Sequence, residues 1–219
     1  MLSALEARQR TLRRITDLGF PEPPKHLPVL ADDELHFVLR TTDEVIERAL
    51  VLNVRINLAF GMPTASARDW LSANSLLDCL STRETDLVSG TAQSSEQEKL
   101  QIEGLWALAW SLGLTPRLDH GAYCGDELAA LLPDLRAQES SRTWRSRTEP
   151  SLRAGDELLA ELDLLYVMTW GIANANLTGA SMPGAVDQYV FWERRRALEF
   201  LQVGSSQGHA GWDEIDLST

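Results

Sequence analysis

The chain has few of the residues from which disulfide-bonded or membrane-spanning structures are built. Its 219 residues include only two cysteines, Cys79 and Cys124, which are too few for a disulfide framework, so we expect two reduced thiols. The longest strongly apolar run, residues 105–110, is far shorter than the roughly 20 residues of a membrane span. Arginines interrupt any apolar region near the N-terminus, so no signal peptide is expected. The sequence therefore predicts a cytoplasmic protein that does not enter a membrane.

Motifs of catalysis and metal binding are also missing. The sequence contains no G-x-S-x-G nucleophile elbow, no P-loop and no G-x-G-x-x-G. Residues 119–126 gather two aspartates, a histidine and a cysteine, but zinc requires more Cys or His ligands at fixed spacing. Asp213, Glu214 and Asp216 lack the loop glycine and terminal glutamate of a calcium loop. We expect no metal and no cofactor, and we assign no catalytic residue.

Positive charge is scarce. Twenty Lys and Arg residues face 32 Asp and Glu residues, which gives a formal net charge of −12, and Lys25 and Lys99 are the only lysines. Nucleic-acid binding is disfavoured because attraction to phosphates requires a basic surface. An acidic surface attracts basic partners and accelerates their encounter, although it also serves solubility alone.

The most apolar long segment is residues 94–114, SSEQEKLQIEGLWALAWSLGL. Leu105, Leu108 and Leu112 recur at helical spacing, and Trp106 and Trp110 lie one turn apart on a neighbouring face. A capping box at 95–98 predicts the start of this helix, and Gly113 predicts its end. We expect this helix to be central and almost wholly buried.

Helical patterns fill most of the remaining chain. Capping boxes at 3–6, 41–44 and 81–84 each predict a helix start. The first helix carries Leu5, Leu12, Ile15 and Leu18 as its apolar residues, and a proline-rich connection runs from it to residue 30. Further helices are expected at 41–59, 66–73, 81–88, 126–132, 151–174 and 186–203, while 34–39 fits a strand or a helix. Residues 134–150 are polar and arginine-rich, so we expect a mobile segment that forms a local basic patch.

The predicted fold class is all-α, a single globular multi-helix domain packed around the central tryptophan-containing helix. Residues 1–30 form an N-terminal helix with its proline-rich connection, and residues 31–219 form the all-α domain proper.

Four segments together resemble a bacterial family known as domain of unknown function 4272. They are 44–48 (EVIER), 101–113 (QIEGLWALAWSLG), 162–166 (LDLLY) followed by Trp170, and 193–201 (ERRRALEFL) followed by 212–216 (WDEID). In the family, the third motif usually carries an arginine and a histidine before the tryptophan. Val167 and Thr169 stand at those places here, so any role of the two family residues is lost. The resemblance implies family membership and no particular activity.

One group of candidate site residues comes from charges in apolar surroundings. Glu103 lies within the central helix and needs a partner or a proton, and Arg194, Arg195 or Arg196 on the last helix are the candidates for that partner. With Trp106, Trp110 and Asp163, these residues are the candidate lining of a pocket.

The C-terminal segment supplies the other candidates, Trp212 and Asp213. A large aromatic residue on a glycine-rich link, 204–211, gains free energy by burial. We therefore predict that Trp212 docks into the same domain and that a neighbouring carboxylate meets an arginine or a helix N-terminus.

Two functions remain open at this point. An acidic, helical protein without a catalytic motif fits a non-catalytic binding protein with a basic protein partner, as immunity proteins that neutralise basic toxins are. The alternative is a small-molecule-binding protein or a hydrolase-like enzyme, in which tryptophan, glutamate and arginine line the pocket.

Overall fold

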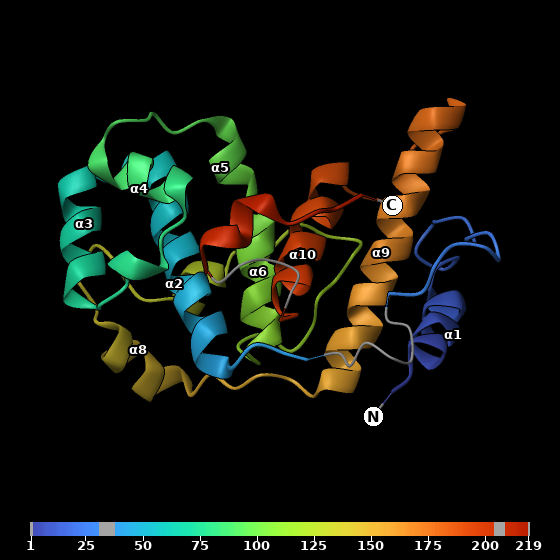
Figure 1. Cartoon of the computed structure of the whole chain (residues 1–219), viewed down its shortest axis with the longest axis horizontal. Helices are drawn as coiled ribbons and strands as arrows, with labels where there is room; N and C mark the ends of the chain where they lie inside the picture. Colours follow the sequence, from blue (N-terminus) through green and yellow to red (C-terminus); the bar gives the residue numbers. More distant parts are fainter. Residues whose placement is uncertain (1, 31–37, 204–208, 219) are drawn as a thin grey trace.

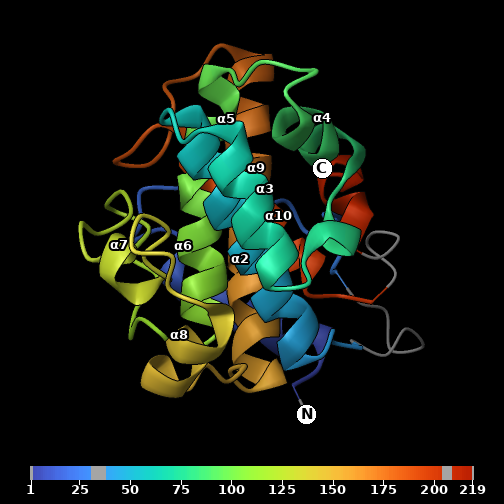
Figure 2. The same cartoon turned by 90° about the vertical axis from the view of Figure 1, so that its left-hand side faces the viewer.

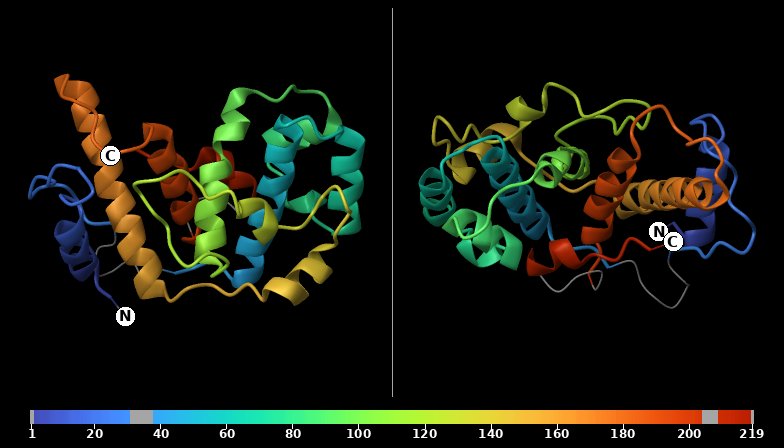
Figure 3. Two further views of the ribbon diagram at one scale, coloured as in Figure 1. Left: turned by 180° about the vertical axis from the view of Figure 1, so that it is seen from behind. Right: turned by 90° about the horizontal axis from the view of Figure 1, so that it is seen from above.

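Helices packed side by side in a row form the body of the molecule, with α6 (Ile102–Ser111) at its centre. A computed structural model describes residues 2–30, 38–203 and 209–218. In it, α2 (Thr42–Ala59) and α10 (Gln188–Phe200) pack on opposite sides of α6 (Figure 1). Beyond α10 the row continues with α9 (Gly155–Thr178) and then α1 (Ala4–Arg14), as the view from above in Figure 3 shows.

The other end of the row and the connections contain shorter elements. Helices α3 (Thr64–Ala73) and α4 (Thr82–Ser89) pack against each other and against α2. The remaining elements are α5 (Glu96–Leu100), α7 (Leu128–Leu131), α8 (Ser141–Thr148) and the 3-10 helices η1 (Leu77–Cys79) and η2 (His209–Glu214). The described residues form no strand, only an isolated bridge between Leu39 and Gln202. The predicted all-α, single-domain fold is confirmed.

Local capping explains where several of these helices begin. The capping boxes at 3–6, 41–44, 81–84 and 95–98 are all formed, each with reciprocal bonds between the N-cap side chain and the third helical residue. These bonds satisfy backbone N–H groups that have no partner within the helix. Gly113 adopts a positive φ of 74°, which a residue with a side chain rarely adopts, and the central helix ends just before it.

The central segment is buried as predicted, but it is not one helix. Leu105, Trp106, Leu108, Trp110 and Leu112 are each at most 5% exposed. A single residue, Gln101, interrupts the segment and separates α5 from α6. Both α5 and α6 pack on α2 and on α10, and the contact of α6 with α10 is the more extensive.

The leucines of α1 do not form its buried face. Leu5 and Leu12 are 63% and 39% exposed, whereas Ala7, Arg8 and Thr11 are buried. The helix is oriented by polar contacts of Arg8 and Thr11 with α9, and the small Ala7 permits close approach. These contacts join residues more than 150 positions apart, so the local hydrophobic pattern does not reveal them.

The segment 134–150 is also more ordered than predicted, because it contains α8. Ser140 caps this helix, and Trp144 is completely buried, with its indole N–H donating to the carbonyl of Leu131. Arg147 forms an ion pair with Glu139. One buried tryptophan thus anchors a sequence that is otherwise polar.

Parts of two other predicted segments lie outside the described residues. Of the segment 34–39, only residues 38 and 39 are described, and Leu39 forms the bridge noted above. Of the link 204–211, residues 209–211 belong to η2. Within the described part of the chain, no helix combines the length and the apolar character required to cross a bilayer.

The central position of α6 predicts a large effect of core truncation. Leu108 is 0% exposed, so Leu108→Ala is expected to lower the free energy of unfolding by about 2–5 kcal/mol through cavity formation. Denaturant unfolding measures this change. Leu177→Ala is the matched control, because Leu177 is 87% exposed, and equal effects of the two variants would contradict the central role of α6.

Candidate functional site

A buried ion pair joins α6 to α10. Glu103 Oε2 accepts hydrogen bonds from Nε and Nη2 of Arg194 at 3.0 and 2.7 Å, and neither side chain is more than 1% exposed. The Nη1 and Nη2 groups of Arg194 also donate to the carbonyls of Asp119 and Ala122, and Glu103 Oε1 accepts from the backbone N–H of Cys124. The predicted partner of Glu103 is confirmed, and the pair holds the loop 115–125 against α6 and α10.

Asp163 lies elsewhere, between α9 and α1. Its carboxylate accepts from Nε and Nη2 of Arg8 at 3.0–3.2 Å and from Oγ1 of Thr11 at 2.6 Å. Arg8 also donates to the carbonyls of Leu27 and Pro28. Asp163 therefore anchors α1 and the proline-rich connection, and it is not brought together with Glu103.

The C-terminal tryptophan docks into the same domain, as predicted. Trp212 is 0% exposed and packs edge to face on Phe200, with a centroid distance of 5.6 Å. The guanidinium of Arg48 lies 5.3 Å from the centre of the Trp212 ring. Gly104 of α6 lies against this ring. A Cβ atom at that position would be in ordinary contact with the ring at 3.5 Å, but only 3.2 Å from the carbonyl oxygen of Glu193 on α10.

Asp213 completes this docking with two short contacts. Its carboxylate accepts from Nη1 of Arg55 on α2 and from Oγ of Ser81, each at 2.6 Å. Burial alone would raise the pKa of Asp213, but the charge of Arg55 and the Ser81 hydrogen bond lower it. The predicted arginine contact of the tail is thus made by Arg55. Arg55 also lies within 3.7 Å of the carboxylates of Glu84 and Glu98.

The structure therefore assigns most of the candidate pocket residues to the interior. Trp106 and Trp110 are 5% and 4% exposed, and of all the candidates only Trp110 lines a large hollow of the surface. That hollow was not anticipated from sequence.

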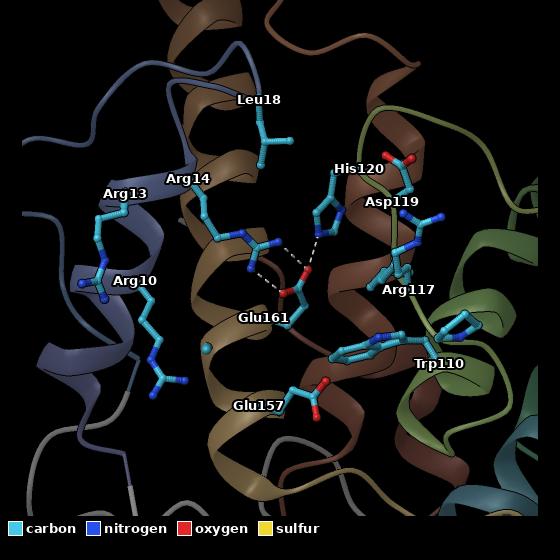
Figure 4. A pocket seen from close by; sticks show the side chains of 13 residues that line it. Arg10, Arg13, Arg14, Leu18, Trp110, Arg117, Asp119, His120, Glu157 and Glu161 are labelled. Carbon is cyan, nitrogen blue, oxygen red and sulfur yellow. Dashed lines mark hydrogen bonds and ion pairs between the residues drawn. The ribbon is translucent and has the colours of Figure 1, made fainter.

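The hollow is a groove of about 620 Å³ between α1, α9 and the loop 115–125. Figure 4 shows α9 as its floor, with Glu157 and Glu161, while Arg10, Arg13 and Arg14 extend from α1 on one side. Arg117, Asp119 and His120 of the loop form the other side, and Trp110 lies at one end. We call this hollow the arginine groove.

A buried carboxylate connects the two walls of the arginine groove. Glu161 accepts from Nη1 of Arg14 at 2.8 Å, and its Oε1 lies 2.5 Å from Nε2 of His120. Burial would raise the pKa of Glu161, but the hydrogen bonds and charges of His120 and Arg14 lower it to about 2. An ionised carboxylate can only accept, so Nε2 of His120 carries the proton.

Three arginines of the groove have no such partner. Among the residues that the structure describes, no hydrogen bond or ion pair engages the guanidinium of Arg10, Arg13 or Arg117, and all three residues are exposed. The carboxylate of Glu6, one turn before Arg10, accepts hydrogen bonds from the backbone N–H and the hydroxyl of Ser3. The spacing of Arg10, Arg13 and Arg14 places them near one another on a helix, but no local pattern links α1 to the loop 115–125.

The second half of that loop forms a different surface. Tyr123 is 48% exposed, stacks on Tyr189 with a centroid distance of 6.3 Å, and donates to the carboxylate of Asp187 at 3.0 Å. The exposed Asp126 and Glu127 follow in the chain. Burial, and then the charge of Glu103, raise the pKa of Tyr189. We call this surface, Tyr123, Asp126, Glu127, Asp187 and Tyr189, the acidic tyrosine patch.

Thiol and metal chemistry receive little support from the described residues. Burial, followed by the charge of Glu47 or Glu103, raises the pKa of both Cys79 and Cys124 to about 11, so both remain thiols at neutral pH. Within the described ranges, no group of three or more His, Cys, Asp or Glu side chains is arranged to hold a metal ion.

Comparison with known proteins identifies a family model. The model described as "Domain of unknown function (DUF4272)" matches residues 7–215. No curated protein and no solved structure matches the chain significantly.

Docking of the tail predicts a stability effect at Trp212. Truncation of this fully buried side chain in Trp212→Ala is expected to lower the free energy of unfolding by about 3–5 kcal/mol. Glu214→Ala, at an exposed neighbour without an ion-pair partner among the described residues, is the control. If both variants unfold at the wild-type denaturant midpoint, the docking does not stabilise the domain.

The lowered pKa of Glu161 predicts a pH-dependent contribution to stability. A carboxyl whose pKa falls from 4.5 to about 2 on folding stabilises the protein above its unfolded pKa, and this stability is lost as the pH falls toward 2. The difference in unfolding free energy between wild type and Glu161→Gln is expected to be on the order of 3 kcal/mol above pH 5. Denaturant titrations should show that this difference in unfolding free energy becomes smaller as the pH is lowered from 5 to 2. A difference that stays constant over this range, or that is matched by the exposed Glu149→Gln, would contradict the assignment.

Proposed function

The chain belongs to the DUF4272 family over residues 7–215, and we propose that it has a non-catalytic role, in which it binds a basic protein partner in the cytoplasm. The acidic tyrosine patch is the observation that carries this proposal. The negative net charge of the chain favours one form of this proposal, in which the chain neutralises a basic toxin as an immunity-type protein does.

The chemistry of the patch suits a cationic partner. Tyrosine is enriched at the energetic centres of protein interfaces, because it offers a large rigid ring with a polar end. Lysine and arginine are attracted both to the ring face and to carboxylates. The patch presents two stacked rings with Asp187 bonded to one of them, and the exposed Asp126 and Glu127 follow Tyr123 by three and four residues in the chain.

Charges in the rest of the molecule support a binding role. Glu103, Asp163 and Asp213 are each occupied by arginines of the same chain. Many exposed carboxylates, in contrast, have no ion-pair partner among the described residues; they are Asp17, Glu22, Asp69, Asp78, Asp86, Asp126, Glu127, Asp134, Glu149, Glu214 and Asp216. Such charges accelerate encounter with a basic protein at low ionic strength.

A pair of charge reversals tests this function. Wild type, Asp126→Lys/Glu127→Lys and Glu214→Lys/Asp216→Lys are used to capture proteins from the native host. Both variants change the net charge equally, and Figure 2 shows α7, which follows Glu127, and the C-terminal segment on opposite sides of the molecule. We expect a basic protein to be retained by wild type and by the second variant, and to be lost from the first.

The captured partner then permits a kinetic test. Its association rate with wild type is expected to fall steeply between low and physiological salt. Equal loss of the partner from both variants, or an association rate that does not depend on salt, would contradict recognition by the patch.

The arginine groove favours a second candidate function, the binding of a small molecule. Its volume of about 620 Å³ lies within the range of ligand pockets, roughly 300–1,000 Å³. Trp110, Glu161 and several arginines line it, which is the composition expected for the alternative function, although the individual residues differ from those predicted.

A further inference from the structure

The arginine groove gathers several cations that form no ion pair among the described residues. Two other hollows share Asn57, Leu135 and Arg136. Arg136 also forms no ion pair in the described chain, whereas Arg147, which lines one of these hollows, is paired with Glu139. Each of these hollows therefore holds one such cation, and the arginine groove holds three. In the groove, Arg14 binds Glu161, whereas Arg10, Arg13 and Arg117 bind no carboxylate of the described chain.

These three arginines lie on opposite walls. Arg10 and Arg13 extend from α1, and Arg117 extends from the loop 115–125, with α9 between them (Figure 4). The floor between the walls carries the carboxylates of Glu157 and Glu161. The groove therefore has unpaired guanidinium groups on both sides and accepts hydrogen bonds in the middle. On the loop side, Arg117 lies on the same wall as the carboxylate of Asp119, which accepts from the backbone N–H of Gly121.

We propose that the arginine groove binds a small hydroxylated molecule with two phosphate or carboxylate groups, one held by Arg10 and Arg13 and the other by Arg117. This proposal rests on the second candidate function, small-molecule binding, and adds the chemical class of the ligand. The planar guanidinium matches the oxygens of phosphates and carboxylates in paired hydrogen bonds.

The floor explains why hydroxyl groups are expected between the two anionic ends. Glu161 is held ionised by Arg14 and His120, and Glu157 is paired with Arg153 at 2.9 Å. Each ionised carboxylate has about four lone-pair sites, so both retain capacity to accept a hydroxyl hydrogen. A third anionic group placed over the floor would instead be repelled by both carboxylates.

The same floor argues against a long polyanion such as RNA. A nucleic-acid backbone would pass its phosphates over Glu157 and Glu161 and then over a surface whose overall charge is −12. Phosphate neutralisation along a strand requires a continuous basic surface. A compact ligand with two separated charges avoids this repulsion.

Calorimetric titration at constant ionic strength tests the ligand class. The probes are fructose 1,6-bisphosphate, fructose 6-phosphate, fructose and glucarate, of which glucarate carries two terminal carboxylates in place of the phosphates. We expect saturable binding of a two-ended anion, with fructose 1,6-bisphosphate or glucarate bound at least about tenfold more tightly than the monophosphate. Fructose should not bind.

Variants locate the binding. Arg117→Gln is expected to weaken binding of the two-ended anion about tenfold and to reduce its advantage over the monophosphate. Arg13→Gln should weaken binding of both anions. Arg142→Gln is the matched control, because Arg142 is exposed on α8 and does not line the groove, and it should bind like wild type.

Several outcomes would overturn the proposal. They are absence of saturable binding by both fructose 1,6-bisphosphate and glucarate, equal effects of Arg117→Gln and Arg142→Gln, and tighter binding of a single-stranded oligonucleotide that the same groove variants abolish.

A further measurement distinguishes an error in the proposed ligand class from an error in the second candidate function, small-molecule binding. Mass spectrometry of small molecules released by denaturing the protein purified from its native host shows whether any ligand is bound. A neutral ligand whose retention requires the groove overturns the anionic class and leaves small-molecule binding intact. Failure to recover any ligand, together with no binding of the probes, overturns both.

Discussion

The ion pair between Glu103 and Arg194 is the interaction on which both candidate surfaces depend. Removing two charges from water is costly, so such a pair persists only when further hydrogen bonds satisfy its remaining groups. Those bonds come from the backbone at Asp119, Ala122 and Cys124. The loop 115–125 cannot leave α6 and α10 without exposing or unpairing a buried charge. This loop supplies one wall of the arginine groove and Tyr123 of the acidic tyrosine patch.

The next residue of the same helix lies against α10 and the C-terminal segment. Gly104, next to Glu103, allows both the carbonyl of Glu193 and the ring of Trp212 to approach α6. The tail that carries Trp212 is secured by Asp213, which reaches Arg55 and Ser81. Two consecutive residues of α6 thus fix two segments that are distant in sequence. Glu103 holds the loop 115–125 through its charge, and Gly104 receives the C-terminal segment because it has no side chain. A substitution of Glu103 or Gly104 is expected to disturb the whole interface between α6 and α10.

Local signals in the sequence predicted more of the fold than of the surfaces. Each capping box lies within four residues, so Thr41 with Glu44 or Ser95 with Glu98 is legible without tertiary information. The partner of Glu103 was also predictable, because a carboxylate in an apolar helix requires a cation and the last helix supplies arginines. The orientation of α1 was not, since Arg8 finds Asp163 across 155 positions. The arginine groove depends on three segments that only the folded chain brings together.

Charge segregation along the chain explains why unused cations collect in that groove. Residues 1–30 contain five Lys and Arg residues against three Asp and Glu residues, although the chain as a whole is strongly acidic. Helix α9 carries four carboxylates and no basic residue, so it attracts the basic α1. Docking consumes two arginines, Arg8 on Asp163 and Arg14 on Glu161. Arg10 and Arg13 are therefore in excess of what the helix contact requires, and they line the groove with no carboxylate partner among the described residues.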